Sequence, residues 1–307
     1  MKLVSYEQQG KPHFGAIVGD RVIDLTLWSA ECAKADSSVL ELPVKIEDFF
    51  EEIDRLQASL KAVVGAFAAS GKKGARASKP LSEVKLLAPI RRPPKTICVA
   101  RNYAEHAKEA GLEISPIPIL FARFSTTFVA NGDPVYVPTV SDDLDWEGEL
   151  AVIIGKNTNG KRLTRDEAMD YVFGYSIFND VTVRDYQFRV TQYTAGKNFR
   201  ASGPFGPVIV TADEIADPHK LDIKTTLNDE QMQFANTDTM IYDIPTILEN
   251  ISEFVDLEAG DVIPTGTPAG VGFKRKPPIF LKDGDTITVE IPGIGSLSNP
   301  VIKEGKD

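Results

Sequence analysis

The chain has 307 residues, of which 42% are hydrophobic and 25% charged, as is ordinary for a globular protein. Forty-four acidic residues against thirty-four basic ones give a formal net charge of −10, which repels nucleic-acid phosphate and anionic membranes. This balance argues against a polyanionic partner. It does not exclude a small anionic substrate, because a bound metal offsets the negative charge locally.

The cysteines and the N-terminal segment indicate a cytoplasmic location. Cys32 and Cys98 form no CxxC pair and have no histidine cluster beside them, so reduced thiols are expected rather than a disulfide framework or a zinc knuckle. The first residues lack the apolar core of a signal peptide, and no run approaches the roughly 18 apolar residues of a membrane span. No membrane partner is therefore expected.

The pattern of the chain predicts two domains. Residues 1–30 alternate like short strands, and apolar residues at helical spacing predict helix over 45–70. The basic, glycine-containing stretch 71–80 begins a linker that extends over about 71–92. We therefore expect a small N-terminal α+β domain over residues 1–80 and a second domain over 93–303.

The second domain is expected to be α+β. Residues 93–303 contain many short strands, each bounded by Gly, Asp or Pro. Thr164 and Glu167 form a capping box that opens one helix, and another is predicted from Asp243 to Phe254. Because strands and helices do not alternate regularly, a doubly wound parallel sheet is disfavoured, and a mixed or antiparallel sheet is expected.

Three acidic residues form a candidate metal site. Glu147 and Glu149 lie two apart at the start of an apolar strand, so both point to the same face. Asp180 ends the next strong apolar strand, from which it can supply a third oxygen ligand. With no Cys or His in the set, Mg²⁺ or Mn²⁺ is favoured over Zn²⁺. The local sequence also allows an alternative in which these carboxylates lie at solvated strand ends.

The motifs around these residues resemble those of the fumarylacetoacetate hydrolase family, and they cover residues 95 to 303. In chain order they are Arg101-Asn102-Tyr103 followed by His106 and Glu109, Asp145-Trp146-Glu147-Gly148-Glu149-Leu150, Asn179-Asp180-Val181-Thr182-Val183-Arg184-Asp185, Gly196-Lys197-Asn198-Phe199, Gly206-Pro207 and the glycine-rich run 260–272. The bacterial subgroup with a small N-terminal domain is the most similar. The resemblance implies a mixed β-sheet or β-roll catalytic domain and a homodimer.

The resemblance also implies roles for the polar residues. Glu147, Glu149 and Asp180 match the ligands of one Mg²⁺ or Mn²⁺ per subunit, which binds the head of a 2-oxo or 2,4-dioxo acid. Lys197 matches a lysine whose ammonium balances enolate charge. His106 and Glu109 match a lid pair that activates water in hydrolytic members, which favours hydrolysis over isomerisation.

The remaining matches concern substrate binding. Arg184 and Gln187 match residues that bind the substrate carboxylate, and Thr267 matches a residue on the carboxylate's other side. Tyr103 and Arg123 are further candidates. Two departures bear on specificity, because Ala100 replaces a common glycine and Arg123 a common lysine. Arg123 is expected either to select a second anionic group at the pocket edge or to form a structural ion pair.

The leading hypothesis is a metal-dependent hydrolase that cleaves the C–C bond of an acylpyruvate-type 2,4-dioxo acid into a carboxylic acid and a 2-oxo acid, as in aromatic compound catabolism. The alternative keeps the metal–enolate chemistry but makes the protein an oxaloacetate decarboxylase or a 2-hydroxymuconate-type isomerase. A third hypothesis, a non-catalytic 2-oxo acid binder, is disfavoured because a binder needs no general base.

Overall fold

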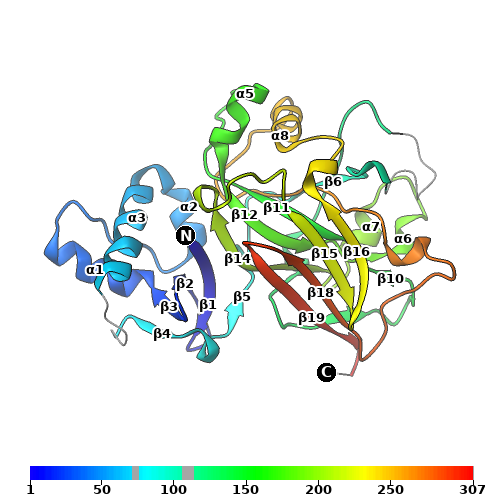
Figure 1. Ribbon diagram of the computed structural model, residues 1–307, viewed down its shortest axis with the longest axis horizontal. Helices are drawn as coiled ribbons and strands as arrows, with labels where there is room; N and C mark the ends of the chain where they lie inside the picture. The colour runs from blue at the N-terminus through cyan, green and yellow to red at the C-terminus, as the bar shows by residue number, and fades with distance from the viewer. Residues whose placement is uncertain (71–75, 106–113, 307) are drawn as a thin grey trace.

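Residues 1–70, 76–105 and 114–306 are described by a computed structural model, in which the N-terminal segment packs beside a larger, strand-rich body (Figure 1). The predicted N-terminal strands are confirmed as an antiparallel meander, and a fourth strand pairs with the third. They are β1 (Lys2–Gln8), β2 (Lys11–Val18), β3 (Arg21–Asp24) and β4 (Ser78–Pro80).

Three helices cover this meander. The helix predicted over 45–70 is confirmed as α2 (Ile46–Glu51) and α3 (Ile53–Ser70), which are separated at Glu52. A further helix, α1 (Leu25–Ala35), was not predicted from the sequence. It begins at Asp24, whose side chain accepts a hydrogen bond from the Leu27 amide, as an N-cap does.

The main sheet runs continuously from the N-terminal segment into the rest of the chain. Its strand order is β17-β11-β12-β14-β1-β2-β3-β4, with β5 also paired to β1 and β8 to β14. Leu3 of β1 lies opposite Ile209 of β14, so the two parts of the chain share one hydrogen-bonded ladder. The strands beyond the meander are β5 (Leu86–Leu87), β8 (Phe128–Val129), β11 (Gly148–Ile154), β12 (Val172–Asn179), β14 (Gly203–Thr211) and β17 (Val262–Pro264).

A second sheet packs against the first and is ordered β16-β15-β18-β19-β9. Among the paired strands of the described chain, only β8–β14 and β9–β19 run parallel, so the expectation of an α+β fold with mixed sheet is confirmed. The strands of the second sheet are β9 (Val135–Val137), β15 (Asp222–Leu227), β16 (Glu230–Asn236), β18 (Thr286–Ile291) and β19 (Gly295–Lys303). Two short antiparallel pairs complete the set, β6 (Ile97–Ala100) with β7 (Ile119–Ala122) and β10 (Leu144–Asp145) with β13 (Thr182–Val183).

The remaining helices are short. Both predicted starts are confirmed: Thr164 and Glu167 form the capping box of α5 (Arg165–Ala168), and Asp243 caps α8 (Ile244–Ser252). The others are α6 (Arg184–Gln187) and α7 (Thr194–Lys197), with single 3-10 turns at Leu81–Glu83, Ser125–Thr127, Met169–Tyr171, Ala212–Glu214, Thr237–Thr239 and Gly272–Lys274. Within the described residues, no helix has the length and apolarity to cross a bilayer.

An aromatic cluster joins the N-terminal helices to the main sheet. The ring of Phe50 in α2 lies 5.1 Å from that of Phe173 in β12 at an edge-on angle, and the ring of Phe49 lies 6.0 Å from the same partner. All three side chains belong to one buried core that also includes residues of β11 and β14. The N-terminal segment therefore shares its core with the strands that carry the acidic residues.

Replacing Phe50 by alanine should lower the free energy of unfolding by about 3–5 kcal/mol, because it empties a buried aromatic site that is 3% exposed. Urea unfolding should still show a single transition, since the core is common to both parts of the chain. Phe254→Ala is the matched control, because that ring is 67% exposed and its loss should change the stability little. Two separate transitions would show instead that the parts unfold independently.

Candidate metal centre

The acidic residues meet where three strands of the main sheet converge. β11 runs antiparallel to β12 and β17, so the start of β11 lies beside the ends of the other two. Glu147 immediately precedes β11, Glu149 lies within it, and Asp180 follows β12. Gly148 lies opposite Asn179 in the ladder, which brings Asp180 across from Glu147.

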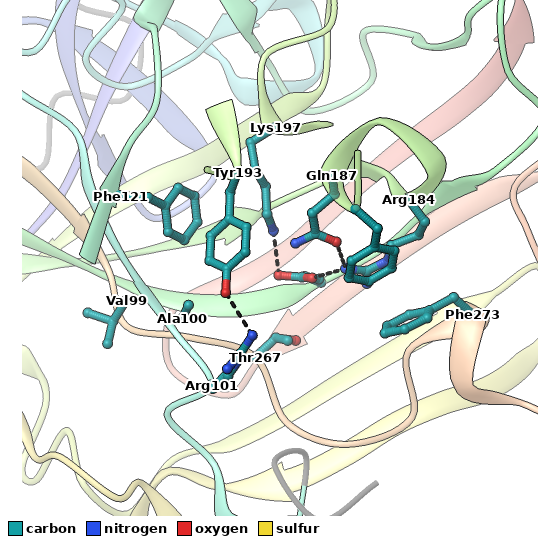
Figure 2. Close-up of a pocket in the computed structure, with 12 residues that line it drawn as sticks. Val99, Ala100, Arg101, Phe121, Arg184, Gln187, Tyr193, Lys197, Thr267 and Phe273 are labelled. Carbon is teal, nitrogen blue, oxygen red and sulfur yellow. Dashed lines mark hydrogen bonds and ion pairs between the residues drawn. The ribbon is translucent and has the colours of Figure 1, made fainter. Parts of the chain in front are cut away.

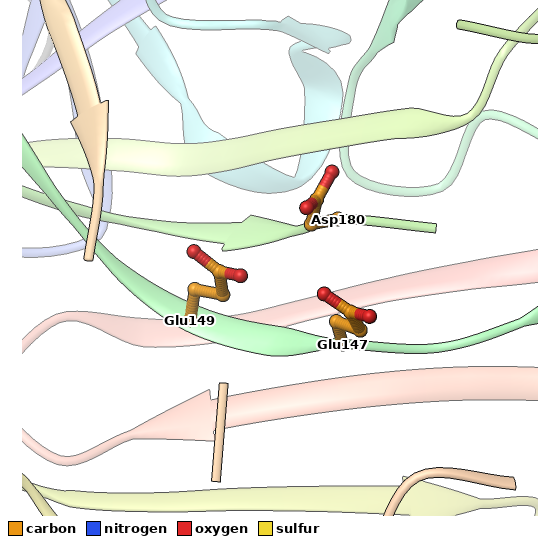
Figure 3. Close-up of side chains that lie close together, drawn as sticks. All are labelled: Glu147, Glu149 and Asp180. Carbon is orange, nitrogen blue, oxygen red and sulfur yellow. The ribbon is translucent and has the colours of Figure 1, made fainter. Parts of the chain in front are cut away.

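The carboxylates of Glu147, Glu149 and Asp180 point toward one another (Figure 3). One oxygen from each lies within 4.8 Å of the others, and all three side chains are buried. Burial raises the pKa of Glu149 well above its usual value, and the charges of Asp180 and Glu147 add to this effect. Three buried like charges are costly unless a cation compensates them. Their all-oxygen donor set fits a hard divalent ion such as Mg²⁺ or Mn²⁺.

Glycine backbone holds Glu149 in place. The Gly266 amide donates a hydrogen bond to Glu149 Oε2 at 2.8 Å. Gly266 has a φ of +100°, and a Cβ there would come within 2.7 Å of the Asn102 Cβ. The loop that follows β17 can therefore approach the carboxylate only because this residue has no side chain.

Lys197 lies directly against the acidic group. Its side chain is 2% exposed, and its Nζ lies 2.8 Å from Glu147 Oε2 and 2.6 Å from Asp180 Oδ2. Burial alone would lower the pKa of the ammonium, but Asp180 and Glu147 outweigh it and raise this pKa above the usual value. The preceding Gly196 lets α7 approach α6, since a Cβ there would lie 2.6 Å from Gln187 backbone atoms.

Arg184 connects the acidic group to the glycine-rich loop. Its Nη1 lies 2.6 Å from Glu147 Oε1 and 3.0 Å from Gln187 Oε1, while its Nε donates to Asp145 Oδ2 at 2.8 Å. Asp145 also accepts from the Gly272 and Phe273 amides. The guanidinium stacks on the Phe273 ring, 4.2 Å from its centre. Its buried Nη2 has no hydrogen-bond partner among the described residues.

Arg123 and Tyr103 lie apart from the pocket lining. Arg123 is buried and pairs with Asp180, and it also donates to Ser202 Oγ at 2.6 Å. Of the two roles expected for it, this placement matches the structural ion pair and not the pocket edge. Tyr103 is buried as well, and the nearby Glu149 charge adds to the effect of burial in raising the pKa of its phenol. Neither residue is among those that line the pocket described below.

A pocket opens beside Glu147 and Lys197 (Figure 2). Arg184, Gln187 and Thr267 line it, as the sequence predicted for substrate-binding residues. The Thr267 hydroxyl donates to the Gly148 carbonyl at 3.0 Å, so its proton is already used within the protein. Ala100, one of the two departures noted in the sequence, also lines the pocket. The other lining residues were not foreseen; they are Val99, Arg101, Phe121, Phe188, Tyr193 and Phe273.

The unforeseen residues differ in how far the sequence could have indicated their place in the pocket. Arg101 stands in the Arg-Asn-Tyr motif and could have been singled out as its one cation. Tyr193 and Phe121 carry no such signal, because only the fold brings them together, with ring centres 5.6 Å apart. His106 and Glu109, the predicted water-activating pair, lie outside the described residues.

Comparison with known proteins agrees with this geometry. Residues 95–302 match the family described as "Fumarylacetoacetate (FAA) hydrolase C-terminal". The chain is 38% identical to oxaloacetate tautomerase YisK of Bacillus subtilis (strain 168), over 98% of this chain and 100% of the relative. It is 43% identical to the mitochondrial oxaloacetate tautomerase fahd2 of Xenopus laevis, over 72% of this chain and 69% of the relative.

A solved structure is similar over almost the full length. It is maleylpyruvate hydrolase from Sphingobium sp. SYK-6 in complex with manganese (II) ion and pyruvate, with a TM-score of 0.77, 29% identity and 99% of each chain covered. A divalent ion is thus present in a protein of this fold, in agreement with the oxygen-only donor set of this site.

Mg²⁺ or Mn²⁺ should raise the melting temperature of the protein, because an ion that binds only the folded state stabilises it, by about 2.7 kcal/mol at a hundred times its Kd. Glu149→Gln should abolish most of the rise by removing one anionic ligand. Thermal scans with metal and with EDTA measure the shift, and Glu253→Gln, at an exposed position, is the matched control. An undiminished shift in Glu149→Gln would contradict the assignment.

The raised pKa of Glu149 also predicts a pH dependence of stability in EDTA. A carboxyl that holds its proton more tightly in the folded state stabilises that state at low pH, and the contribution is lost as the pH rises from about 4.3 through the folded-state pKa. Wild type should therefore lose stability, relative to Glu149→Gln, as the pH rises over this window. Urea unfolding at a series of pH values measures the difference; parallel curves would refute it.

Proposed function

This chain belongs to the fumarylacetoacetate hydrolase family, and we propose that it is a divalent-metal enzyme that interconverts the enol and keto forms of a 2-oxo diacid such as oxaloacetate. The observation that carries the proposal is the buried Lys197 ammonium, which contacts Glu147 and Asp180 and also lines the pocket. The relative from Bacillus subtilis, similar along its whole length, is named for this reaction. C–C hydrolysis, the leading hypothesis from the sequence, becomes the second candidate.

Different residues would bind the metal and stabilise charge at the 2-oxo group of the substrate. Glu147, Glu149 and Asp180 would hold the metal, which when bound supplies Lewis-acid polarisation of the 2-oxo group. Tautomerisation moves a proton between the 2-oxo oxygen and C3, and negative charge builds on that oxygen as the proton leaves. A fixed cation in a site shielded from water stabilises this charge strongly.

Lys197 is suited to be that cation. Its raised pKa keeps it protonated at neutral pH, and its burial prevents water from replacing it as the partner of the oxygen. Its two carboxylate partners fix the ammonium in position before substrate arrives. Lys197 therefore pairs with the developing oxyanion without further reorganisation.

Arg184 and Gln187 are suited to bind the carboxylate next to the 2-oxo group. Arg184 offers its unpartnered Nη2, and Gln187 accepts from Arg184 through Oε1, which leaves its amide nitrogen turned into the pocket (Figure 2). Both residues come from α6, so one short helix orients the head group. His106, which the sequence predicted as part of a water-activating pair, is our candidate for carrying the proton to C3.

The second candidate is hydrolysis of an acylpyruvate-type 2,4-dioxo acid. Two observations favour it: the similarity to maleylpyruvate hydrolase and the presence of both His106 and Glu109 in the sequence. Hydrolysis needs a water activated by a base, whereas tautomerisation needs only a proton carrier and a stabilised enolate. The two candidates therefore differ in their dependence on His106 and Glu109.

Lys197→Met should lower kcat for enol-oxaloacetate ketonisation by about 10²–10³, the usual effect of removing one oxyanion partner. Loss of enol absorbance with Mg²⁺ or Mn²⁺ present measures the rate. The metal-induced rise in melting temperature should persist, which separates loss of catalysis from loss of metal. Lys220→Met, at an exposed lysine, is the matched control. A Lys197→Met enzyme with wild-type kcat would refute the mechanism.

The same preparations distinguish the two candidate reactions. Pyruvate release from an acylpyruvate should be slow compared with enol-oxaloacetate ketonisation if the protein is a tautomerase. Fast pyruvate release that is lost in His106→Ala would favour the hydrolase instead. Absence of both activities would overturn both.

A further inference from the structure

The cations that line the pocket are not equivalent. Lys197 contacts two carboxylates and Arg184 contacts two, so their charges are largely compensated within the protein. Arg101 also lines the pocket, yet across residues 1–70, 76–105 and 114–306 no carboxylate forms an ion pair with it. A chain with a net charge of −10 thus directs at its candidate active site a guanidinium that no carboxylate of the described residues compensates.

The backbone holds Arg101 in an unusual conformation. Its φ is +58°, in the left-handed region that non-glycine residues rarely adopt. The next residue, Asn102, maintains this conformation through three hydrogen bonds: its Nδ2 donates to the carbonyls of Tyr242 at 2.9 Å and Thr265 at 2.8 Å, and its Oδ1 accepts from the Tyr242 amide at 2.8 Å. Strained residues that the surroundings hold in place are typical of functional sites.

The side chain of Arg101 is held at the end of the pocket away from Lys197 (Figure 2). Its Nη2 donates to the Tyr193 hydroxyl at 2.9 Å, and Tyr193 in turn packs edge-on against Phe121. One donor of the guanidinium fork is therefore used to orient it. The other N–H groups of the guanidinium remain for bidentate hydrogen bonding to an anion.

We propose that Arg101 binds the second carboxylate of a 2-oxo diacid and so makes the enzyme select dicarboxylates over monocarboxylates. The inference rests on the proposed function, because that function places the reactive head at Lys197 and Arg184. The tail of a short diacid then extends toward Arg101 at the opposite end of the pocket. Compensated cations bind the head, and the uncompensated cation neutralises the extra charge of the tail.

Binding of L-malate and L-lactate tests the assignment without turnover. Both carry a 2-hydroxy acid head that cannot enolise, and they differ in the second carboxylate. Calorimetry with Mg²⁺ should show that wild type prefers malate by about ten- to a hundredfold, as for hydrogen bonds to a charged group. Arg101→Gln should lose that preference while its lactate affinity stays within about twofold, and Arg101→Lys should keep part of it.

A purely structural role for Arg101 gives a different pattern. If Arg101 only supports Tyr193, then Arg101→Gln and Tyr193→Phe should weaken malate and lactate equally, and this would overturn the proposal. Equal affinity of wild type for the two acids would overturn it as well. Circular dichroism and melting temperature confirm that each variant folds, and Arg101→Lys serves as the variant that changes the residue least.

Kinetics separate this inference from the proposed function. In wild type, kcat/KM for oxaloacetate should exceed that for its 4-methyl ester, and Arg101→Gln should remove the difference mainly by raising KM for the diacid. If wild type ketonises neither compound, the proposed function fails while the malate and lactate comparison still decides the role of Arg101. If wild type ketonises both equally well, only the inference fails.

Discussion

The burial of three carboxylates at one edge of the main sheet is the constraint on which the rest of the site depends. Glu147, Glu149 and Asp180 would repel one another strongly in a medium that excludes water, and the pKa of Glu149 is raised first by burial and then by the charges of Asp180 and Glu147. Lys197 and Arg184 face these carboxylates from α7 and α6, and Arg123 pairs with Asp180 from the other side. These cations pair with Glu147 and Asp180, and Arg184 is shared with Asp145, whereas no ion pair to Glu149 is formed among the described residues. A divalent ion would compensate the remaining charge.

The antiparallel sheet makes this concentration of charge possible. β11 starts where β12 and β17 end. The stretch that precedes β11 and the stretches that follow β12 and β17 therefore meet at the same edge of the sheet. The stretch after β17 brings the Gly266 amide to Glu149, and the stretch after β6 is tied to it through Asn102. The same hydrogen bonds therefore position a metal ligand and the wall of the pocket that carries Arg101.

The pocket has one end that is dense in charge and one that is not. At the first end, Lys197 and Arg184 are fixed by carboxylates before any substrate binds, as electrostatic preorganisation requires. At the other, Arg101 and Tyr193 contact each other and few charged groups. In the proposed function, the first end would bind the 2-oxo acid head and the second would discriminate among the tails. Proteins named tautomerase and hydrolase share this fold.

The sequence by itself determined the α+β class, the N-terminal strands, the starts of α5 and α8 and the three acidic residues, since strand parity, capping and ordered motifs are local properties. It also indicated Lys197, Arg184, Gln187 and Thr267 through their neighbours in the chain. Only the tertiary structure decided that Arg123 pairs with Asp180, that α1 exists, and that Arg101, Phe121 and Tyr193 form one wall. These contacts join residues far apart in sequence, and which carboxylate compensates which cation depends on distances that no local pattern encodes.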